Sequence, residues 1–226
     1  MRTLVLWDID LTLLDLRRLG GSWFQQALFE VTGTSAAETP PFGGRTDRWI
    51  AMRLLADVGV EPTDELIDQL HAAAVRIADA DRQRMADVGV VLPGVPEVLK
   101  ELAARPEVVQ TLVTGNLRPI AGFKVDTFGL SEYLDLDIGG YGGSSHDRSV
   151  LVADALAGTR GRHDGDFAVV VVGDTPHDVR AALAHQARAV GVATGSYSHD
   201  ALVAAGAHAV LPDLGDTARV LAAILP

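Results

Sequence analysis

The sequence predicts a doubly wound α/β fold, in which helices cover both faces of a parallel sheet, with an inserted α-helical unit. Three observations support this prediction: short apolar runs alternate with amphipathic segments, one long stretch has only helical periodicity, and acidic residues stand where apolar runs end. Runs of Val and Leu without polar alternation are typical of strands buried on both faces. Alternating strands and helices are typical of a parallel sheet.

The strands and helices of this core can be placed from the pattern. Turn residues bound the apolar runs, and Pro or a polar cap opens several of the amphipathic segments. A weaker strand is expected near 134–138, and an edge strand at 209–211. The clearer strands are 3–7, 108–113, 167–172 and 188–193, and the helices are 93–105, 117–128, 147–157, 176–186 and 198–206.

The stretch between Asp15 and about Gly89 has no strand pattern. Apolar residues recur at helical spacing around Trp23, Trp49 and Leu70, which predicts three to four helices. An insertion directly after the first strand would lie over the carboxyl edge of the sheet, where open α/β sheets bind ligands. We therefore expect two domains: a core of residues 1–14 and 90–226, and a helical cap of residues 15–89.

Composition limits the function. With 226 residues, 48% hydrophobic, the chain can bury a full core. It has no apolar stretch near about 20 residues and opens into a strand instead of a signal peptide, so we expect no membrane insertion or secretion and a cytoplasmic location. The absence of Cys excludes disulfides and thiolate catalysis. A net charge of -11 argues against a nucleic-acid partner but permits a small phosphorylated metabolite. For the oligomeric state, a monomer and a homodimer are both compatible with the sequence.

Two carboxylates stand at the end of the first strand. Asp8 and Asp10 are two positions apart, so their side chains start on one side of an extended chain. Their charges repel unless a cation or a proton separates them. We interpret Asp8 as a nucleophile toward phosphoryl groups and Asp10 as its proton donor and acceptor, with Mg²⁺ relieving the repulsion. The alternative is a polar turn after a strand.

Polar residues also follow two other strands. Thr114 precedes Gly115 and Asn116, so a hydroxyl and adjacent backbone N–H groups can grip a phosphoryl oxygen. Asp174 ends a Val-rich strand, and Asp178 follows it in a helix that opens with Pro. The alternatives are a capping role for Thr114 or Asn116 and a helix-dipole interaction for Asp178.

These motifs, in this order, resemble those of the haloacid dehalogenase superfamily of phosphohydrolases. The segment 8–12 resembles the first motif, 114–116 the second and 173–178 the fourth, and the helical insertion stands where a C1-type cap belongs. The Gly-Asp-Thr-Pro-x-x-Asp form of 173–178 is similar to that of the phosphoglycolate-phosphatase-like subgroup. Leu11 departs from the pattern, because Gly is very often found there; we expect it to alter the turn or to pack under the cap.

The resemblance implies a role for each motif. Asp8 would attack phosphorus and form an aspartyl phosphate, while Asp10 exchanges the proton. Mg²⁺ would lie between Asp8, the backbone carbonyl of Asp10 and Asp174, and Asp178 would hold a metal-bound water or orient a cation. The phosphoryl group would be bound by Thr114 with the amides of Gly115 and Asn116.

The cation of the third motif has two candidates. Arg148 stands just ahead of a helix, where relatives usually carry a Lys-Pro pair, and it is the favoured choice. Lys124 follows the second motif by eight residues and is a possible second contributor. In the cap, Arg45 follows Gly43 and Gly44 and is a candidate substrate contact, with a solvated helix start as the alternative.

The function implied is that of a Mg²⁺-dependent phosphatase acting on a small phosphomonoester. A sugar phosphomutase of the β-phosphoglucomutase type would need the same Asp8 and Asp10 but would protect its phospho-enzyme from water. A haloacid dehalogenase is disfavoured, because that reaction needs neither Asp10 as a proton donor nor a metal-binding Asp174. An inactive binding module is disfavoured because the reactive residues are all present.

Overall fold

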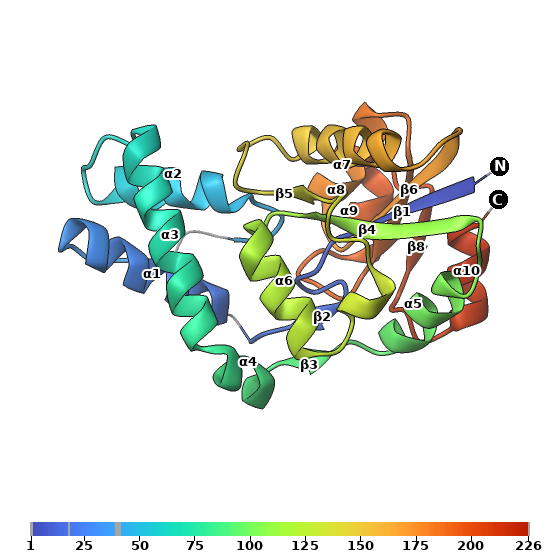
Figure 1. The fold of residues 1–226 in the computed structure, drawn as a ribbon, viewed down its shortest axis with the longest axis horizontal. Coiled ribbons are helices and arrows are strands. Elements are labelled where there is room, and N and C mark those ends of the chain that lie inside the picture. The colour runs from blue at the N-terminus through green and yellow to red at the C-terminus, as the bar shows by residue number, and fades with distance from the viewer. Residues whose placement is uncertain (1, 18, 39–41, 226) are drawn as a thin grey trace.

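The computed structural model describes residues 2–17, 19–38 and 42–225, which form two lobes (Figure 1). One lobe is a six-stranded parallel sheet with helices on both faces, and the other consists of four helices inserted after the first strand. The predicted fold class is therefore confirmed. No helix among the described residues is both long and apolar enough to span a membrane.

The sheet has the strand order β5-β4-β1-β6-β7-β8, and every neighbouring pair is parallel. The chain builds outward from β1 to one side and then crosses to β6 on the other side, so β1 lies at the point where the direction of winding reverses. The four clearer strands and the edge strand are confirmed. The strands are β1 (Arg2–Trp7), β4 (Val108–Thr114), β5 (Gly140–Tyr141), β6 (Phe167–Gly173), β7 (Arg188–Val192) and β8 (Ala209–Leu211).

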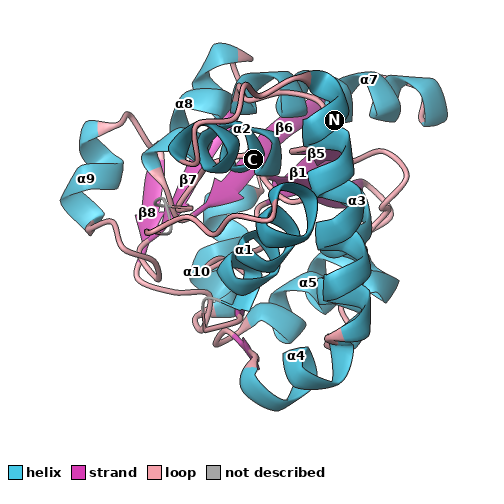
Figure 2. Cartoon of the chain, turned by 90° about the vertical axis from the view of Figure 1, so that its left-hand side faces the viewer, coloured by secondary structure: helices cyan, strands magenta, loops and turns pink. Residues whose placement is uncertain are grey.

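Helices lie on both faces of this sheet (Figure 2). The five helices expected in the core are confirmed; one of them continues to Arg162, beyond the expected end at 157, and the last helix of the chain was not predicted. One face carries α5 (Val95–Ala103), α6 (Arg118–Thr127) and α10 (Thr217–Ile224), and the other carries α7 (Arg148–Arg162), α8 (Pro176–Ala184) and α9 (His199–Ala204).

The central strand shows why the apolar run has no polar alternation. Val5 and Trp7 of β1 pack in the hydrophobic cluster on one face of the sheet, and Leu4 and Leu6 pack in the cluster on the other. The Trp7 indole N–H donates to the Gln110 side-chain oxygen at 3.1 Å, which satisfies its buried donor. Successive residues therefore alternate between two cores, as the strand period of two requires.

The strand expected near 134–138 is wrong. The strand at the edge opposite β8 is β5, which comes just after this segment, and a short 3₁₀ helix, η1 (Ser131–Tyr133), precedes the segment. Leu134 and Ile138 are buried in the core without pairing in the sheet, so their apolar pattern reflected burial alone. A Cβ on Gly140 would lie 1.9 Å from the Leu151 carbonyl oxygen, so glycine is needed where β5 passes α7.

The described residues of the inserted unit form four helices with a hydrophobic cluster of their own. Trp23 and Leu70 are buried in this cluster and Trp49 packs against it, which agrees with the expected three to four helices. Leu117 and Ile120, at the start of α6, belong to the same cluster and join the unit to the sheet lobe. The helices are α1 (Leu19–Thr32), α2 (Asp47–Asp57), α3 (Asp64–Ala80) and α4 (Arg82–Val88).

Two short antiparallel strands mark the places where the chain enters and leaves the helical unit. They are β2 (Leu14–Asp15) and β3 (Val90–Val91), and Leu14 pairs with Val91. The sequence did not predict them, because two residues are too few to show a strand period. Because these two strands pair with each other, both crossings lie at one place.

Candidate active site

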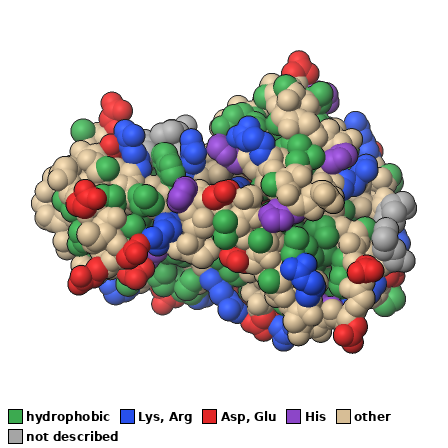
Figure 3. All heavy atoms as spheres, turned by 90° about the horizontal axis from the view of Figure 1, so that it is seen from above, with side chains coloured by type: hydrophobic (Ala, Val, Ile, Leu, Met, Phe, Trp, Pro, Cys, Tyr) green, Lys and Arg blue, Asp and Glu red, His purple; other side chains and the backbone are tan. Residues whose placement is uncertain are grey.

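The carboxyl ends of three adjacent strands bring the polar motifs together. Trp7, at the end of β1, pairs with Leu112 of β4 and with Val172 of β6, so Asp8, Thr114 and Asp174 emerge at one edge of the sheet. A cavity of about 1120 Å³ lies there, and charged side chains gather on the surface between the lobes (Figure 3). Among the residues lining it are Asp8, Asp10, Thr114, Gly115, Asn116, Lys124, Arg148, Asp174 and, from the helical lobe, Arg45 and Asp47.

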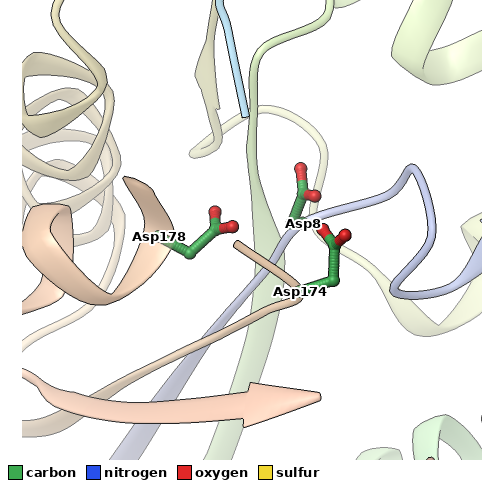
Figure 4. Close-up of side chains that lie close together, drawn as sticks. All are labelled: Asp8, Asp174 and Asp178. Atoms are coloured by element: carbon green, nitrogen blue, oxygen red, sulfur yellow. The ribbon is translucent and has the colours of Figure 1, made fainter. Parts of the chain in front are cut away.

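Three buried carboxylates converge beside this cavity. One oxygen from each of Asp8, Asp174 and Asp178 lies within 4.8 Å of the other two (Figure 4). Burial raises the pKa of Asp8 to about 7, although Arg148 opposes the shift. Burial and the Asp8 and Asp178 charges raise the pKa of Asp174 to about 9. The cluster therefore favours protons or a cation between these groups.

Arg148, the first residue of α7, bridges two members of the carboxylate cluster. Its guanidinium donates to Asp8 Oδ1 at 2.6 Å and forms an ion pair with Asp178 Oδ1 at 2.7 Å. Burial would lower the pKa of Arg148, but the Asp178 and Asp8 carboxylates hold it above its ordinary value. The side chain is only 6% exposed, so this buried cation stays charged and fixes Asp8.

Asp178 and Asp174 differ in how firmly the protein holds them. The Thr175 amide and hydroxyl donate to Asp178 Oδ2 at 3.1 and 2.6 Å, in a capping box that begins α8. With Arg148 on the other oxygen, both oxygens of Asp178 have protein partners. No protein hydrogen bond to the Asp174 carboxyl occurs in the described part of the chain. The protein therefore holds Asp178 through Thr175 and Arg148, whereas the Asp174 carboxyl has no such hydrogen bonds among the described residues.

A second network surrounds Asp10. The Lys124 ammonium donates to both Asp10 oxygens, at 2.6 and 2.7 Å, and to Asn116 Oδ1 at 2.8 Å. The Asn116 side-chain amide donates to Asp10 at 2.7 Å and to the Thr114 hydroxyl at 2.8 Å. Burial would raise the pKa of Asp10, but Lys124 and the Asn116 hydrogen bond lower it below its ordinary value. The two candidate cations thus contact different carboxylates: Arg148 contacts Asp8, and Lys124 contacts Asp10.

The turn after β1 has the backbone geometry that favours glycine. Leu11 has φ +60°, and its amide donates to the Leu14 carbonyl at 2.7 Å. Its carbonyl accepts a hydrogen bond from the Thr194 hydroxyl. Leu11 therefore adopts a left-handed conformation that glycine would adopt with less strain, and it lines the cavity. The expectation that it alters the turn or packs under the cap stays a prediction.

The helical lobe contributes a loop to the opposite wall. The Arg45 guanidinium lies over the Trp49 ring, 4.5 Å from its centroid, and lines the cavity. Gly44 has φ +69°, and a Cβ there would lie 2.7 Å from the Thr175 hydroxyl. The loop thus rests against the start of α8. Sequence reasoning missed Asp47, which also lines the cavity; its only signal was its place directly after the helix-capping Thr46.

The parallel sheet, the acidic residues at its carboxyl edge and the inserted helices define a capped Rossmann-like enzyme. The chain belongs to the family of haloacid dehalogenase-like hydrolases, which matches residues 5–183. The resemblance seen in the motifs is therefore confirmed. A comparison with curated proteins found no match.

Solved structures show the same fold over the whole chain. A hydrolase from Pseudomonas syringae is 20% identical, with a TM-score of 0.69 and 99% of each chain covered. A structure from Haemophilus somnus 129pt, named a predicted phosphoglycolate phosphatase, is 17% identical, with a TM-score of 0.65 and 97% of each chain covered. One from Bacteroides vulgatus, provisionally named a β-phosphoglucomutase, is 18% identical, with a TM-score of 0.68, and covers 100% of this chain and 91% of its own. At these identities the likeness concerns the fold alone.

Proposed function

We propose that this hydrolase is a Mg²⁺-dependent phosphatase that cleaves a small phosphomonoester through an aspartyl phosphate on Asp8. The observation that carries the proposal is the position of Asp8 at the cavity, with Arg148 on one oxygen and the carboxyl of Asp174 beside it. Asp10 lies two residues on, at the same cavity. A nucleophilic carboxylate and a separate proton-exchanging carboxylate are the groups that this reaction needs.

The carboxylate cluster fits Mg²⁺, which prefers oxygen ligands and keeps several waters. Its donors are buried, the pKa values of Asp8 and Asp174 are raised, and the Asp174 oxygens have no protein partner among the described residues. The ion would be held by Asp8, Asp174 and the backbone carbonyl of Asp10. Asp178 is the third carboxylate of the cluster. When bound, the ion would neutralise charge at the transferring phosphoryl group.

The residues of the chain divide the reaction between them. A carboxylate oxygen of Asp8 attacks phosphorus, the bond to the leaving oxygen breaks, and that oxygen takes a proton from Asp10. Water then attacks the aspartyl phosphate and gives its proton to Asp10, which frees Asp8 and inorganic phosphate. Arg148 holds Asp8 in place. The phosphoryl oxygens are bound by Thr114 with the Gly115 and Asn116 amides.

Asp10 must carry a proton when the leaving group departs. In the structure Lys124 and Asn116 lower its pKa, so it is ionised before substrate arrives. A phosphoryl group entering the cavity brings negative charge close to Lys124 and Asp10. This charge competes for the Lys124 ammonium and raises the pKa of Asp10, so substrate binding itself would favour proton uptake.

We also propose that residues 15–89 form a cap over a core of residues 1–14 and 90–226. The paired strands β2 and β3 at the two crossings support these boundaries. The loop with Arg45 would then select the leaving group of the substrate, because it faces the carboxyl edge of the sheet from the cap side.

A phosphomutase is the second candidate, favoured by the B. vulgatus structure of similar fold. It would use the same Asp8 and Asp10 but pass the phosphoryl group to a sugar phosphate instead of to water. Conversion of one sugar phosphate into its isomer, without release of phosphate, would identify this activity.

The test measures phosphate release from an aryl phosphate and a panel of small phosphate esters. Wild-type protein with Mg²⁺ should turn over, EDTA should abolish activity, and Asp8→Asn should be inactive while folded. Asp64→Asn, at an exposed carboxylate of α3, is the matched control and should keep full activity. Substantial turnover by Asp8→Asn would remove Asp8 as the nucleophile.

A further inference from the structure

The helical lobe is hydrogen-bonded to the loop that follows β4. The Asp47 amide donates to the Gly115 carbonyl at 2.7 Å, and the Leu117 amide donates to Asp47 Oδ2 at 2.7 Å. One residue of α2 therefore brackets Gly115 and Asn116, whose amides face the cavity in the proposed reaction. Both bonds reach across the boundary between the lobes.

Close packing leaves this loop no room to shift. A Cβ on Gly115 would lie 2.0 Å from the Arg45 carbonyl oxygen, and one on Gly142 would lie 1.8 Å from the Gly115 carbonyl oxygen. The Gly142 amide also donates to the Asn116 carbonyl at 2.9 Å. The loop is thus held between the helical lobe and the segment after β5, and a small movement of either would move it.

The carboxylate of Asp47 is not needed to begin its own helix. Thr46 is the N-cap of α2, and its hydroxyl accepts from the Trp49 amide at 3.2 Å. Asp47 is 6% exposed, and no ion pair to it occurs in the described part of the chain. A buried carboxylate without a paired cation is costly, so helix capping alone gives no reason for an acid at this position.

We infer that Asp47 is a positioning residue for phosphoryl transfer, which holds the Gly115 and Asn116 amides in register by accepting the Leu117 N–H. This inference rests on the proposed phosphatase function. Because Asn116 also donates to Asp10 and Thr114, a shift of the loop would disturb the proton-exchanging carboxylate as well. Asp47 therefore couples the placement of the helical lobe to the alignment of the phosphate site.

The test compares Asp47→Ala, Asp47→Asn and Asp64→Ala. Asp64 also begins a helix of the helical lobe, and its side chain is 84% exposed, so it is a matched control. Three quantities are measured: kcat with an aryl phosphate, the affinity for inorganic phosphate by calorimetry with Mg²⁺, and the thermal midpoint. The calorimetric measurement needs no turnover, so it tests the loop even if the phosphatase proposal fails.

We expect Asp47→Ala to lower kcat and phosphate affinity by roughly 10- to 100-fold, the effect of leaving a buried N–H donor unpaired. Asp47→Asn should restore most of both, because its amide oxygen can accept from Leu117. Asp64→Ala should match wild type. Absence of phosphate release by wild type would sink the phosphatase proposal alone.

Two outcomes would overturn the positioning role. One is wild-type kcat and phosphate affinity in Asp47→Ala, and the other is an Asp47→Asn variant that is folded but as impaired as Asp47→Ala. If Asp47→Ala does not fold, Asp47→Glu replaces it: the longer chain keeps the acceptor but displaces the loop. Asp47→Glu should lose at least 10-fold in phosphate affinity, and an unchanged value would contradict the inference.

Discussion

Replacing Asp174 with Asn should stabilise the metal-free protein at alkaline pH. The substitution keeps the size of the side chain and replaces a carboxyl that, in the folded metal-free protein, must either hold a proton or stand as a charge in a cluster whose oxygens lie within 4.8 Å of one another. At that separation two carboxylates repel by about 3 kcal/mol at an effective dielectric constant of about 20. With EDTA at pH 8, we expect the free energy of unfolding of Asp174→Asn to be about 1–3 kcal/mol higher than that of wild type. This difference corresponds to a rise of roughly 2–10 °C in the thermal midpoint.

The sign of the pH dependence follows from the raised pKa of Asp174. Burial and its acidic neighbours raise that pKa to about 9 from an ordinary value of 3.8. Between these values the unfolded chain has lost the proton and the folded protein keeps it, so this group makes wild type less stable as pH rises. Asn does not titrate. The advantage of Asp174→Asn should therefore be small near pH 5 and grow toward pH 8.

Thermal unfolding followed by tryptophan fluorescence measures the effect, because Trp7 and Trp23 are buried in different hydrophobic clusters. Each protein is melted at pH 5 and pH 8, with EDTA or with Mg²⁺. Mg²⁺ should make wild type the protein with the higher thermal midpoint at pH 8, since the ion binds the folded wild type and loses a ligand in Asp174→Asn. A variant less stable than wild type in EDTA at pH 8 would refute the repulsive cluster.

Three further substitutions test the roles of the two cations and the strain in the turn after β1. Arg148→Met should slow phospho-enzyme formation, measured by rapid quench, by more than about 100-fold. Lys124→Met should slow that step far less and should lower turnover through its effect on Asp10. Equal effects of the two variants on phospho-enzyme formation would contradict the assignment of Arg148 to Asp8 and of Lys124 to Asp10. Leu11→Gly should raise the free energy of unfolding in urea by up to about 1 kcal/mol, because φ +60° is strained for a side-chain residue; a fall would show that packing of the Leu side chain outweighs this strain.

The positions of Asp8, Thr114 and Asp174 could be predicted from sequence because parallel strands end at one edge. Each residue follows an apolar run, and the register of β1 with β4 and β6 then brings them together. The choice between Arg148 and Lys124 could not be made in this way. Both reach the cavity from helices, and only the fold shows that each contacts a different carboxylate.

Two features gave too little local signal to be predicted. The segment 134–138 has the apolar pattern of a strand, yet it is buried without pairing, and β5 is two residues long at a glycine. Asp47 resembles a solvated first-turn acid, because helix starts often carry one. Its burial depends on a contact between the two lobes. In that contact Asp47 accepts a hydrogen bond from Leu117, which lies 70 positions further along the sequence. Such contacts follow from tertiary packing and leave no periodic trace.

Covalent labelling tests the central claim most directly. Mg²⁺-loaded protein is mixed with a radiolabelled phosphate ester, quenched in acid within milliseconds, and digested for peptide mapping. We expect label on the peptide that contains Asp8, released by hydroxylamine as an acyl phosphate should be, and no label in Asp8→Asn. Turnover of the ester with no protein-bound label, or with label on another residue, would contradict the account.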